Sequence, residues 1–501
     1  MLRDFCECEI IKVEKGKGGQ YMPNKLYGDN RVTVVVGSVE SGSERYLSLL
    51  YGEIAPALPY VLTVTAADDL DDEKEGYYNI IAVGTAQDNP YIASLVKDGI
   101  ISIPEDPDGY VIRVLDNPKN AEKQLTVLAG ATSHSVCYAV SEYIGNYLPE
   151  SESRDLHKLR FVPHFTRKTS ETYRIRTPKI RERGVWTWGH VIYDYKRLID
   201  NMQRLRMNIV AVWNDYPPIN AREFVEYAHG AGIKVIWGFS IGWGYKVNIA
   251  DNEELDRIIN EAVAHYEKNY SDLGGDGIYF QAFTETEQDT QNGINIAHAV
   301  RIYVNKIHEK FKSRFGNIRI QFGLHATSVK KYLDEIGGID PDVEVIWEDL
   351  GCFPYEYTPE NTVDYQQMLS LTERITCLGE GNMGVVLKGL SCLEWFKFEN
   401  QFGRYAMGAW NERSISDRRY TQNKFWRRVN ALWLKNGRLA KETILRLSSG
   451  GANTTFALVE DGLLEETIPF AVAAMAELMW DPETDMEDVI YRSAIRPDIE
   501  I

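Results

Sequence analysis

The sequence lacks the short motifs that mark metal and nucleotide sites. It contains no HExxH, no paired CxxC and no Walker loop. Its six cysteines are thinly spread over 501 residues, and Cys6 and Cys8 stand too close together for a zinc-binding pair. We therefore expect no bound metal, no cofactor, and cysteines that stay reduced.

Long apolar runs and an excess of positive charge are also missing. The formal net charge is −18 and is spread along the chain, which argues against a nucleic-acid partner. No run approaches the roughly 18 uncharged apolar residues of a membrane span, and the N-terminus has no apolar signal core. We expect a cytoplasmic protein with no membrane partner, although a chain from which a signal had been removed would look the same.

What the sequence does contain is enough apolar material for two or three domains, since 44% of its residues are hydrophobic. Residues 1–165 alternate short β-branched runs with helical patterns, which predicts a compact α/β domain. The strands are expected at 31–39, 60–69, 77–84, 109–115 and 124–131, with helices at 88–99 and 133–148. The polar segment 149–183 has weak periodicity, so we expect the domain boundary within it.

From residue 184 onward, strands and helices alternate regularly. Eight strands are expected, at 184–188, 208–213, 233–239, 277–283, 318–324, 343–347, 384–390 and 405–410. Strands separated by helices pair in parallel, and eight such units in roughly 250 residues match a closed barrel. The predicted fold class is therefore α/β: a smaller α/β sandwich domain, a (β/α)8 TIM barrel over 180–440, and a short helical C-terminal segment over 441–501.

Carboxylates cluster where the fourth predicted strand ends, in DGIYFQAFTETEQD at 276–289. Barrel enzymes carry their catalytic groups just past the C-terminal ends of the strands. Glu285 is placed there to donate a proton, and Glu287 follows it. A second carboxylate would come from Glu348 or Asp349, of which only one can face the barrel centre if the strand continues. We marginally prefer Asp349, and an ion pair or a helix N-cap is an equal alternative for both.

Several stretches resemble glycoside hydrolases that carry a small α/β domain before their barrel, namely the family 20 β-hexosaminidases and the family 67 α-glucuronidases. The resemblance covers most of the chain and rests on YYNIIAVGTAQDNPYI at 77–92, RGVWTW at 183–188, AFTETE at 282–287, GAWNE at 408–412 and FWRRVNALW at 425–433. It implies that Glu285 is the general acid. Thr284 stands where family 20 has an aspartate and family 67 a serine.

The same resemblance implies roles in binding a sugar. Arg183 is similar to the family 20 arginine that contacts sugar hydroxyls, and Trp410 and Glu412 are similar to residues that pack against and hydrogen-bond a terminal sugar. The other predicted substrate-binding residues lie at or near strand ends: Asp215, Thr284, Glu287, His325, Trp347, Tyr355 and Lys388. Lys388 and His325 would suit a uronate carboxylate if the sugar is acidic.

Together these features predict an O-glycosyl hydrolase that acts on a terminal sugar of a glycan or oligosaccharide. Two alternatives stay open: an inverting, family 67-like α-glucuronidase, and a catalytically inactive carbohydrate-binding protein, because folds outlive their chemistry. The expected partner is a carbohydrate, and the resemblance implies pairing into a homodimer. The sequence does not distinguish the sugar, its anomeric configuration, or retention from inversion.

Overall fold

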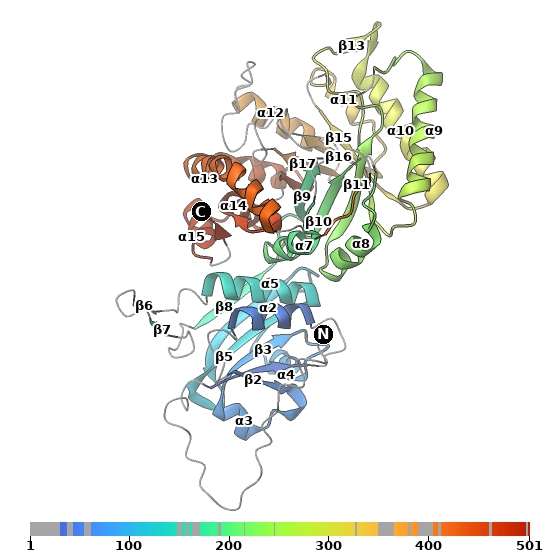
Figure 1. The fold of residues 1–501 in the computed structure, drawn as a ribbon. Coiled ribbons are helices and arrows are strands. Elements are labelled where there is room, and N and C mark those ends of the chain that lie inside the picture. Colours follow the sequence, from blue (N-terminus) through green and yellow to red (C-terminus); the bar gives the residue numbers. More distant parts are fainter. Residues whose placement is uncertain are drawn as a thin grey trace, which may run out of the picture.

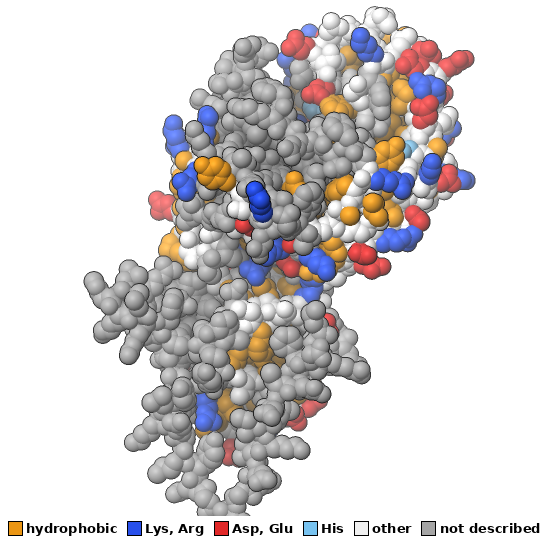
Figure 2. All heavy atoms as spheres, viewed as in Figure 1, with side chains coloured by type: hydrophobic (Ala, Val, Ile, Leu, Met, Phe, Trp, Pro, Cys, Tyr) orange, Lys and Arg blue, Asp and Glu red, His pale blue; other side chains and the backbone are white. Residues whose placement is uncertain are grey.

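The computed structural model shows a sheet domain at one end and a barrel at the other (Figure 1). It describes residues 31–37, 44–54, 62–147, 153–155, 160–162, 171–188, 192–214, 216–244, 246–325, 328–348, 365–378, 382–388, 404–408, 412–459, 463–496 and 499–500. On the face shown in Figure 2, basic and acidic side chains are interspersed over the outer helices of the barrel. Within the described part, no helix is both long and apolar enough to cross a bilayer.

The first domain is built on a six-stranded sheet with the order β2-β1-β3-β5-β4-β8. Its strands are β1 Val32–Val36, β2 Leu62–Ala66, β3 Asn79–Gly84, β4 Tyr110–Asn117, β5 Asn120–Gly130 and β8 Thr172–Arg176. The first five confirm the predicted strands. The sixth, β8, pairs antiparallel with β4 and comes from the polar segment beyond residue 165.

Both faces of the central strands β1 and β3 are covered, because these strands are buried along their whole length. Helices α2 (Glu44–Ile54) and α5 (Ser133–Glu142) pack on one face, and α4 (Pro90–Lys97) packs on the other. Local sequence fixes the start of α4, where the Asn89 side chain accepts hydrogen bonds from two backbone N–H groups and a proline follows it. A short helix, α3 (Asp72–Tyr77), links β2 to β3.

The second domain is a closed barrel of eight parallel strands, as predicted. The strands are β9 Glu182–Trp188, β10 Ile209–Trp213, β11 Lys234–Ser240, β12 Gly277–Gln281, β15 Arg319–Leu324, β16 Val343–Glu348, β17 Met383–Leu387 and β18 Ala452–Leu458. The barrel closes where β18 pairs with β9. The first seven strands lie where the sequence predicts them.

The predicted eighth strand, at 405–410, is wrong. Residues 404–408 form no strand, and 409 and 410 lie outside the described residues. The backbone of 405–408 instead bonds to the segment around Ile219 and Asn220, through Ile219 N to Tyr405 O at 2.7 Å and Met407 N to Asn220 Oδ1 at 2.9 Å. The true eighth strand, β18, lies beyond the predicted end of the barrel at 440.

Helices surround the barrel: α7 Tyr195–Arg204, α8 Ala221–Gly230, α9 Asn252–Asn269, α10 Ile296–Phe315, α11 Leu333–Ile336, α12 Tyr365–Thr376, α13 Glu412–Ser449, α14 Phe470–Trp480 and α15 Met486–Ala494. The large apolar core lies between these helices and the strands, and a smaller aromatic core fills the barrel interior. Three two-stranded pieces lie outside the sheet and the barrel: β6 Ser153–Asp155 with β7 Arg160–Val162, β13 Thr290–Gln291 with β14 Ile294–Asn295, and β19 Ile468–Pro469 with β20 Ile499–Glu500.

The two domains meet around Trp480 at the end of α14. The guanidinium groups of Arg183 and Arg206 each lie 4.9 Å from the Trp480 ring, one on the barrel strand β9 and the other just before β10. Arg183 also forms an ion pair at 2.7 Å with Asp108 of the first domain. Trp480 itself packs against Tyr110 and Tyr138 of the first domain, with ring centroids 5.5 and 6.1 Å apart. These ring contacts and the Arg183–Asp108 pair join the domains, and the two guanidinium groups stabilise the Trp480 ring between them.

Candidate active site

Strand alternation in β16 shows which carboxylate faces the barrel centre. Val343, Val345 and Trp347 belong to the outer core between strands and helices, whereas Ile346 belongs to the interior core. Glu348 shares the parity of Ile346, and its side chain is fully buried. Of the two acids weighed from the sequence, the inward one at the top of the barrel is therefore Glu348. From the sequence we marginally preferred Asp349 as the second carboxylate, and Asp349 lies outside the described residues.

Glu348 is the centre of a polar cluster assembled from four neighbouring strands. Its Oε1 accepts hydrogen bonds from Tyr279 Oη at 2.7 Å and from Gln281 Nε2, both on β12. Its Oε2 lies 3.2 Å from His325 Nε2 and 3.1 Å from Lys388 Nζ, which follow β15 and β17. The structure thus brings together Glu348, His325 and Lys388, all predicted site residues.

A glycine in β15 leaves room for this cluster. A Cβ atom at Gly323 would lie 2.4 Å from Glu348 Oε1 and 2.4 Å from the Tyr279 hydroxyl oxygen. Real Cβ atoms do not approach other heavy atoms so closely, and both side chains are held by packing. Gly323 is therefore required by the hydrogen bond between Tyr279 and Glu348.

The charges around Glu348 keep it ionised. Burial alone would raise the pKa of Glu348, but the adjacent His325 and Lys388, with the hydrogen bonds from His325 and Gln281, hold its pKa well below the usual range. Burial also raises the pKa of Tyr279, and the charge of Glu348 raises it further, so the phenol stays protonated and donates. The cluster is a buried anion surrounded by donors.

Glu285 lies four residues beyond β12, and its side chain is exposed. Trp243 Nε1, from the loop after β11, donates a hydrogen bond to Glu285 Oε2 at 2.5 Å. The Trp243 ring packs edge-on against Trp213 at 6.2 Å, and Trp213 packs against Tyr279 at 6.0 Å. A chain of aromatic rings thus connects Glu285 to the Glu348 cluster.

A cavity of about 600 Å³ opens beside Glu285. Its walls come from the loop after β11 and from the loop and β13–β14 hairpin after β12. The lining residues are Gly242, Trp243, Gly244, Lys246, Val247, Asn248, Ile249, Ala282, Phe283, Glu285, Thr286, Gln288, Gln291, Asn292 and Ile296. Its size lies within the range of small-molecule sites, and Glu285 is the one carboxylate among its described lining residues.

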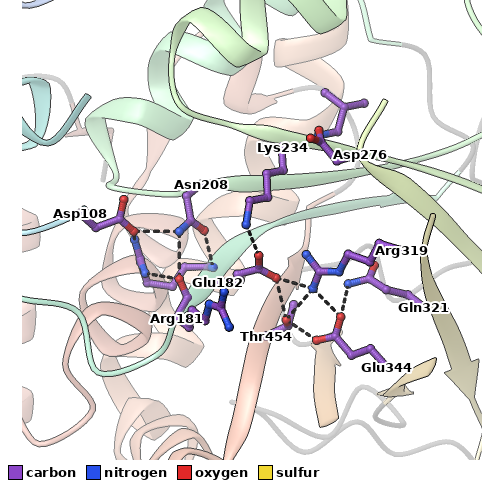
Figure 3. Close-up of polar contacts among 12 residues, drawn as sticks. Asp108, Arg181, Glu182, Asn208, Lys234, Asp276, Arg319, Gln321, Glu344 and Thr454 are labelled. Carbon is purple, nitrogen blue, oxygen red and sulfur yellow. Dashed lines mark hydrogen bonds and ion pairs between the residues drawn. The ribbon is translucent and has the colours of Figure 1, made fainter. Parts of the chain in front are cut away.

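The opposite end of the barrel holds a second ionic cluster, shown in Figure 3. Glu182 and Glu344, near the N-terminal ends of β9 and β16, both bind Arg319. Lys234 Nζ lies 2.6 Å from Glu182, and Gln321 donates to Glu344 at 2.8 Å. This end of a barrel carries no strand-end loops for catalysis, so we interpret the cluster as structural.

Three residues predicted to contact the substrate are buried, and each has a structural role. Arg183 is buried near the N-terminal end of β9, where it bonds to Asp108 and to backbone carbonyls. Trp347 points outward into the core between strands and helices. Thr284 is buried, and its hydroxyl accepts from His325 N at 3.3 Å while its carbonyl accepts from Ser328 Oγ at 2.6 Å. Thr284 therefore supports the loop that carries His325.

The structure describes only some of the remaining residues that were predicted for the site. Glu287 is exposed on the same loop as Glu285. Asp215, Tyr355 and Trp410 lie outside the described residues, as does the side chain of Glu412 at the start of α13.

Sequence reasoning missed Tyr279 and Gln281, which donate to Glu348, and the amide side chains of the cavity. A usable signal was present, because Tyr279 and Gln281 stand two apart on one strand and so share its inward face. Asn248 and Gln291 gave no such signal, since they come from loops whose positions depend on tertiary contacts.

One group of possible metal ligands lies away from this site. Among the described residues, His308, Asp340 and Asp342 bring one ligand atom each within 4.8 Å of one another. Lys312 Nζ lies 2.6 Å from Asp342 and neutralises part of the charge that would attract a cation. The cluster is accounted for by these ion pairs.

Comparison with known proteins adds little to this geometry. No family model matches the chain, and no curated protein matches its sequence. Among solved structures, it is similar to one titled "Structure of CpGH84D", with a TM-score of 0.49 and 13% sequence identity over 94% of this chain and 69% of that one. So low a similarity carries no argument about activity, and the barrel assignment rests on the strand pairing itself.

Proposed function

We propose that this protein is a glycoside hydrolase that removes a terminal sugar, with Glu285 as the general acid. The observation that carries the proposal is the position of Glu285 at the C-terminal end of the fourth barrel strand, on the wall of a cavity and hydrogen-bonded by Trp243. Hydrolysis of a glycosidic bond needs a carboxyl group that protonates the leaving oxygen. The resemblance of AFTETE to families 20 and 67 supports the same residue.

In this proposal Glu348 is a positioning residue. Its carboxylate is fully buried and already has four partners, so it is poorly placed to attack a sugar. It holds His325 and Lys388 at adjacent strand ends. The second carboxylate of the reaction is then proposed to be Asp349, which comes directly after Glu348 in the sequence.

The same contacts weaken the acidic-sugar hypothesis. A uronate carboxylate would have to compete with Glu348 for both His325 and Lys388. We therefore propose a neutral terminal sugar.

A carbohydrate-binding protein without activity is the second candidate. The observation that favours it is that, of Glu285 and Glu348, only Glu285 is accessible, whereas hydrolysis generally uses two carboxyl groups. A binding protein would keep the cavity and its polar lining but would not need Glu285 as an acid.

The decisive experiment measures release of nitrophenol from aryl glycosides of N-acetylhexosamines, neutral hexoses and uronic acids. We expect activity on a neutral sugar. On the methyl glycoside of that sugar, whose leaving group must be protonated, we expect Glu285→Gln to lower kcat/KM by about 10³-fold, since general acid catalysis contributes roughly 10²–10⁴. The matched control is Glu226→Gln, an exposed glutamate on helix α8. A Glu285→Gln variant that still hydrolyses at the wild-type rate would contradict the proposal, and sugar binding without turnover in the wild type would favour the binding protein.

A further inference from the structure

The cavity beside Glu285 has walls that are fixed by their own hydrogen bonds. Backbone N–H of Ile249 donates to Gln291 Oε1 at 2.9 Å, and Asn292 Nδ2 donates to Asn248 Oδ1 at 3.2 Å. These bonds tie the β13–β14 hairpin to the loop after β11. The hairpin turns at Asn292 and Gly293, which both have positive φ, as a tight hairpin turn requires. The cavity is therefore preorganised.

The base of the hairpin is anchored as well. Asp289 accepts an ion pair from Lys331 at 2.7 Å, which connects the loop after β12 to the segment after β15. The backbone N–H of Ile296, where α10 begins, donates to the carbonyl of Asp289 at 3.0 Å. The wall that faces Glu285 is thus connected to two neighbouring parts of the barrel.

The lining suits a polyhydroxylated ligand. Gln288, Asn248 and Asn292 are exposed amides, and an amide offers both donors and acceptors, as sugar hydroxyls do. Trp243 and Phe283 supply an apolar surface against which the C–H face of a sugar ring can pack. Of the lining residues that the structure describes, Lys246 alone is basic, which does not fit a ligand with several phosphates.

The position of Glu285 indicates which part of a substrate this cavity would hold. A general acid gives its proton to the glycosidic oxygen, so it stands on the side of the leaving group. Glu285 lines the cavity directly, whereas Glu348, His325, Lys388, Tyr279 and Gln281 do not line it. The cavity is therefore a separate part of the barrel top, connected to the Glu348 cluster through the rings of Trp243 and Trp213.

We propose that this cavity is the leaving-group subsite and that the leaving group is itself a neutral sugar, bound through Gln288 and Lys246. The inference rests on the proposed hydrolysis. Glu285 gives its proton to the glycosidic oxygen, the bond from that oxygen to the sugar C1 breaks with its electron pair staying on oxygen, and the leaving sugar departs as an alcohol. Water supplies a hydroxyl group to C1 and a proton that restores the carboxyl group.

The test compares two substrates that share a terminal sugar, the one found active among the aryl glycosides: its nitrophenyl glycoside and a disaccharide in which a second neutral sugar replaces nitrophenol. The variant is Gln288→Ala combined with Lys246→Ala, since both residues are exposed and their removal should not unfold the protein. The control is Lys310→Ala, an exposed lysine on α10 that does not line the cavity.

We expect the double variant to lower kcat/KM for the disaccharide about tenfold or more, because each lost hydrogen bond contributes roughly 1 kcal/mol. The nitrophenyl glycoside should lose less than the disaccharide, because its ring has no hydroxyl groups to bond to these two side chains, and the unfolding midpoint should not change. An equal loss on both substrates, or no loss on either, would overturn the subsite while leaving hydrolysis established. If the wild type cleaves neither substrate, the proposed function fails and the subsite with it.

Discussion

The two ends of the barrel use buried carboxylates in different ways. At the N-terminal end, Glu182 and Glu344 share Arg319, and Lys234 completes a set with two acids and two bases. At the C-terminal end, the single carboxylate of Glu348 faces two basic side chains, His325 and Lys388. The first cluster balances its charges within itself. The second holds more basic groups than acids, at the end where barrel enzymes bind their substrates, and this difference distinguishes a structural cluster from a candidate site.

The largest expected effect comes from neutralising one carboxylate at each end. Glu348→Gln should lower the free energy of unfolding by about 3–5 kcal/mol, because it leaves His325 and Lys388 buried without their anion. Glu344→Gln should cost less, since Arg319 keeps its contact with Glu182. Urea unfolding of both variants measures the difference. Equal losses of unfolding free energy in the two variants would contradict the expectation that the Arg319–Glu182 contact limits the loss in Glu344→Gln.

Low pH should remove part of the stability contributed by the ionic cluster at the N-terminal end of the barrel, over a defined pH range. Burial alone would raise the pKa of Glu182, but Arg319 and Lys234 lower it from 4.5 to about 2. Because the folded pKa is the lower one, this group stabilises the protein above about pH 4.5 and loses that contribution as the pH falls toward 2. The contribution is on the order of 3 kcal/mol. The unfolding free energy of Glu182→Gln should therefore fall less steeply over this window than that of the wild type, and parallel curves would contradict the assignment.

A smaller loss of stability is expected from a substitution at Gly323, which leaves space for the Glu348 carboxylate. Gly323→Ala would place a methyl group against the Tyr279–Glu348 hydrogen bond and should cost about 1–3 kcal/mol of stability. The control is Gly230→Ala at the end of α8, where a Cβ would meet no atom within 4 Å. Thermal unfolding of the pair compares them. The prediction is wrong if both variants are as stable as the wild type.

The smallest effect concerns the bond to Glu285. Trp243→Phe keeps a ring but removes the N–H that donates to the carboxylate, and hydrogen bonds to charged groups contribute about 1.5–3 kcal/mol. We expect kcat/KM on an active aryl glycoside to fall roughly tenfold. Trp237→Phe, in the outer core, is the control for loss of a tryptophan and should retain activity.

Much of this architecture could be predicted because its signals are local. Seven barrel strands are short β-branched runs between helical patterns, and residues 77–84 and 124–131 become adjacent strands of the first domain. The eighth strand was not predicted because ANTTFAL at 452–458 begins with an alanine and an asparagine and follows a 38-residue helix. YAMGAW was selected instead because GAWNE resembles family 20, but its backbone bonds to residues outside the barrel.

The site was harder to predict, because its residues meet only after the barrel closes. Glu285, His325 and Lys388 could be selected from their positions at strand ends. The choice between Glu348 and Asp349 depended on the phase of one strand, which the sequence leaves undetermined. Arg183 illustrates the opposite case. It is the second residue of a barrel strand, and the contact that fixes its role, with Asp108, comes from 75 residues earlier in the chain.

The late position of β18 also constrains how the barrel can form during synthesis. Thr454 pairs with Glu182, a separation of 272 residues (454 − 182). At a synthesis rate of about 5–20 residues per second, on the order of 15–55 s pass between the synthesis of β9 and that of β18, its second neighbour. Throughout that interval one edge of β9 cannot form its native pairing, and unpaired strand edges promote association between chains. A chain whose synthesis stalls before residue 452 would hold an unclosed barrel sheet with an unpaired, aggregation-prone edge at β9. The nascent chain should therefore depend on chaperones until its last strand emerges.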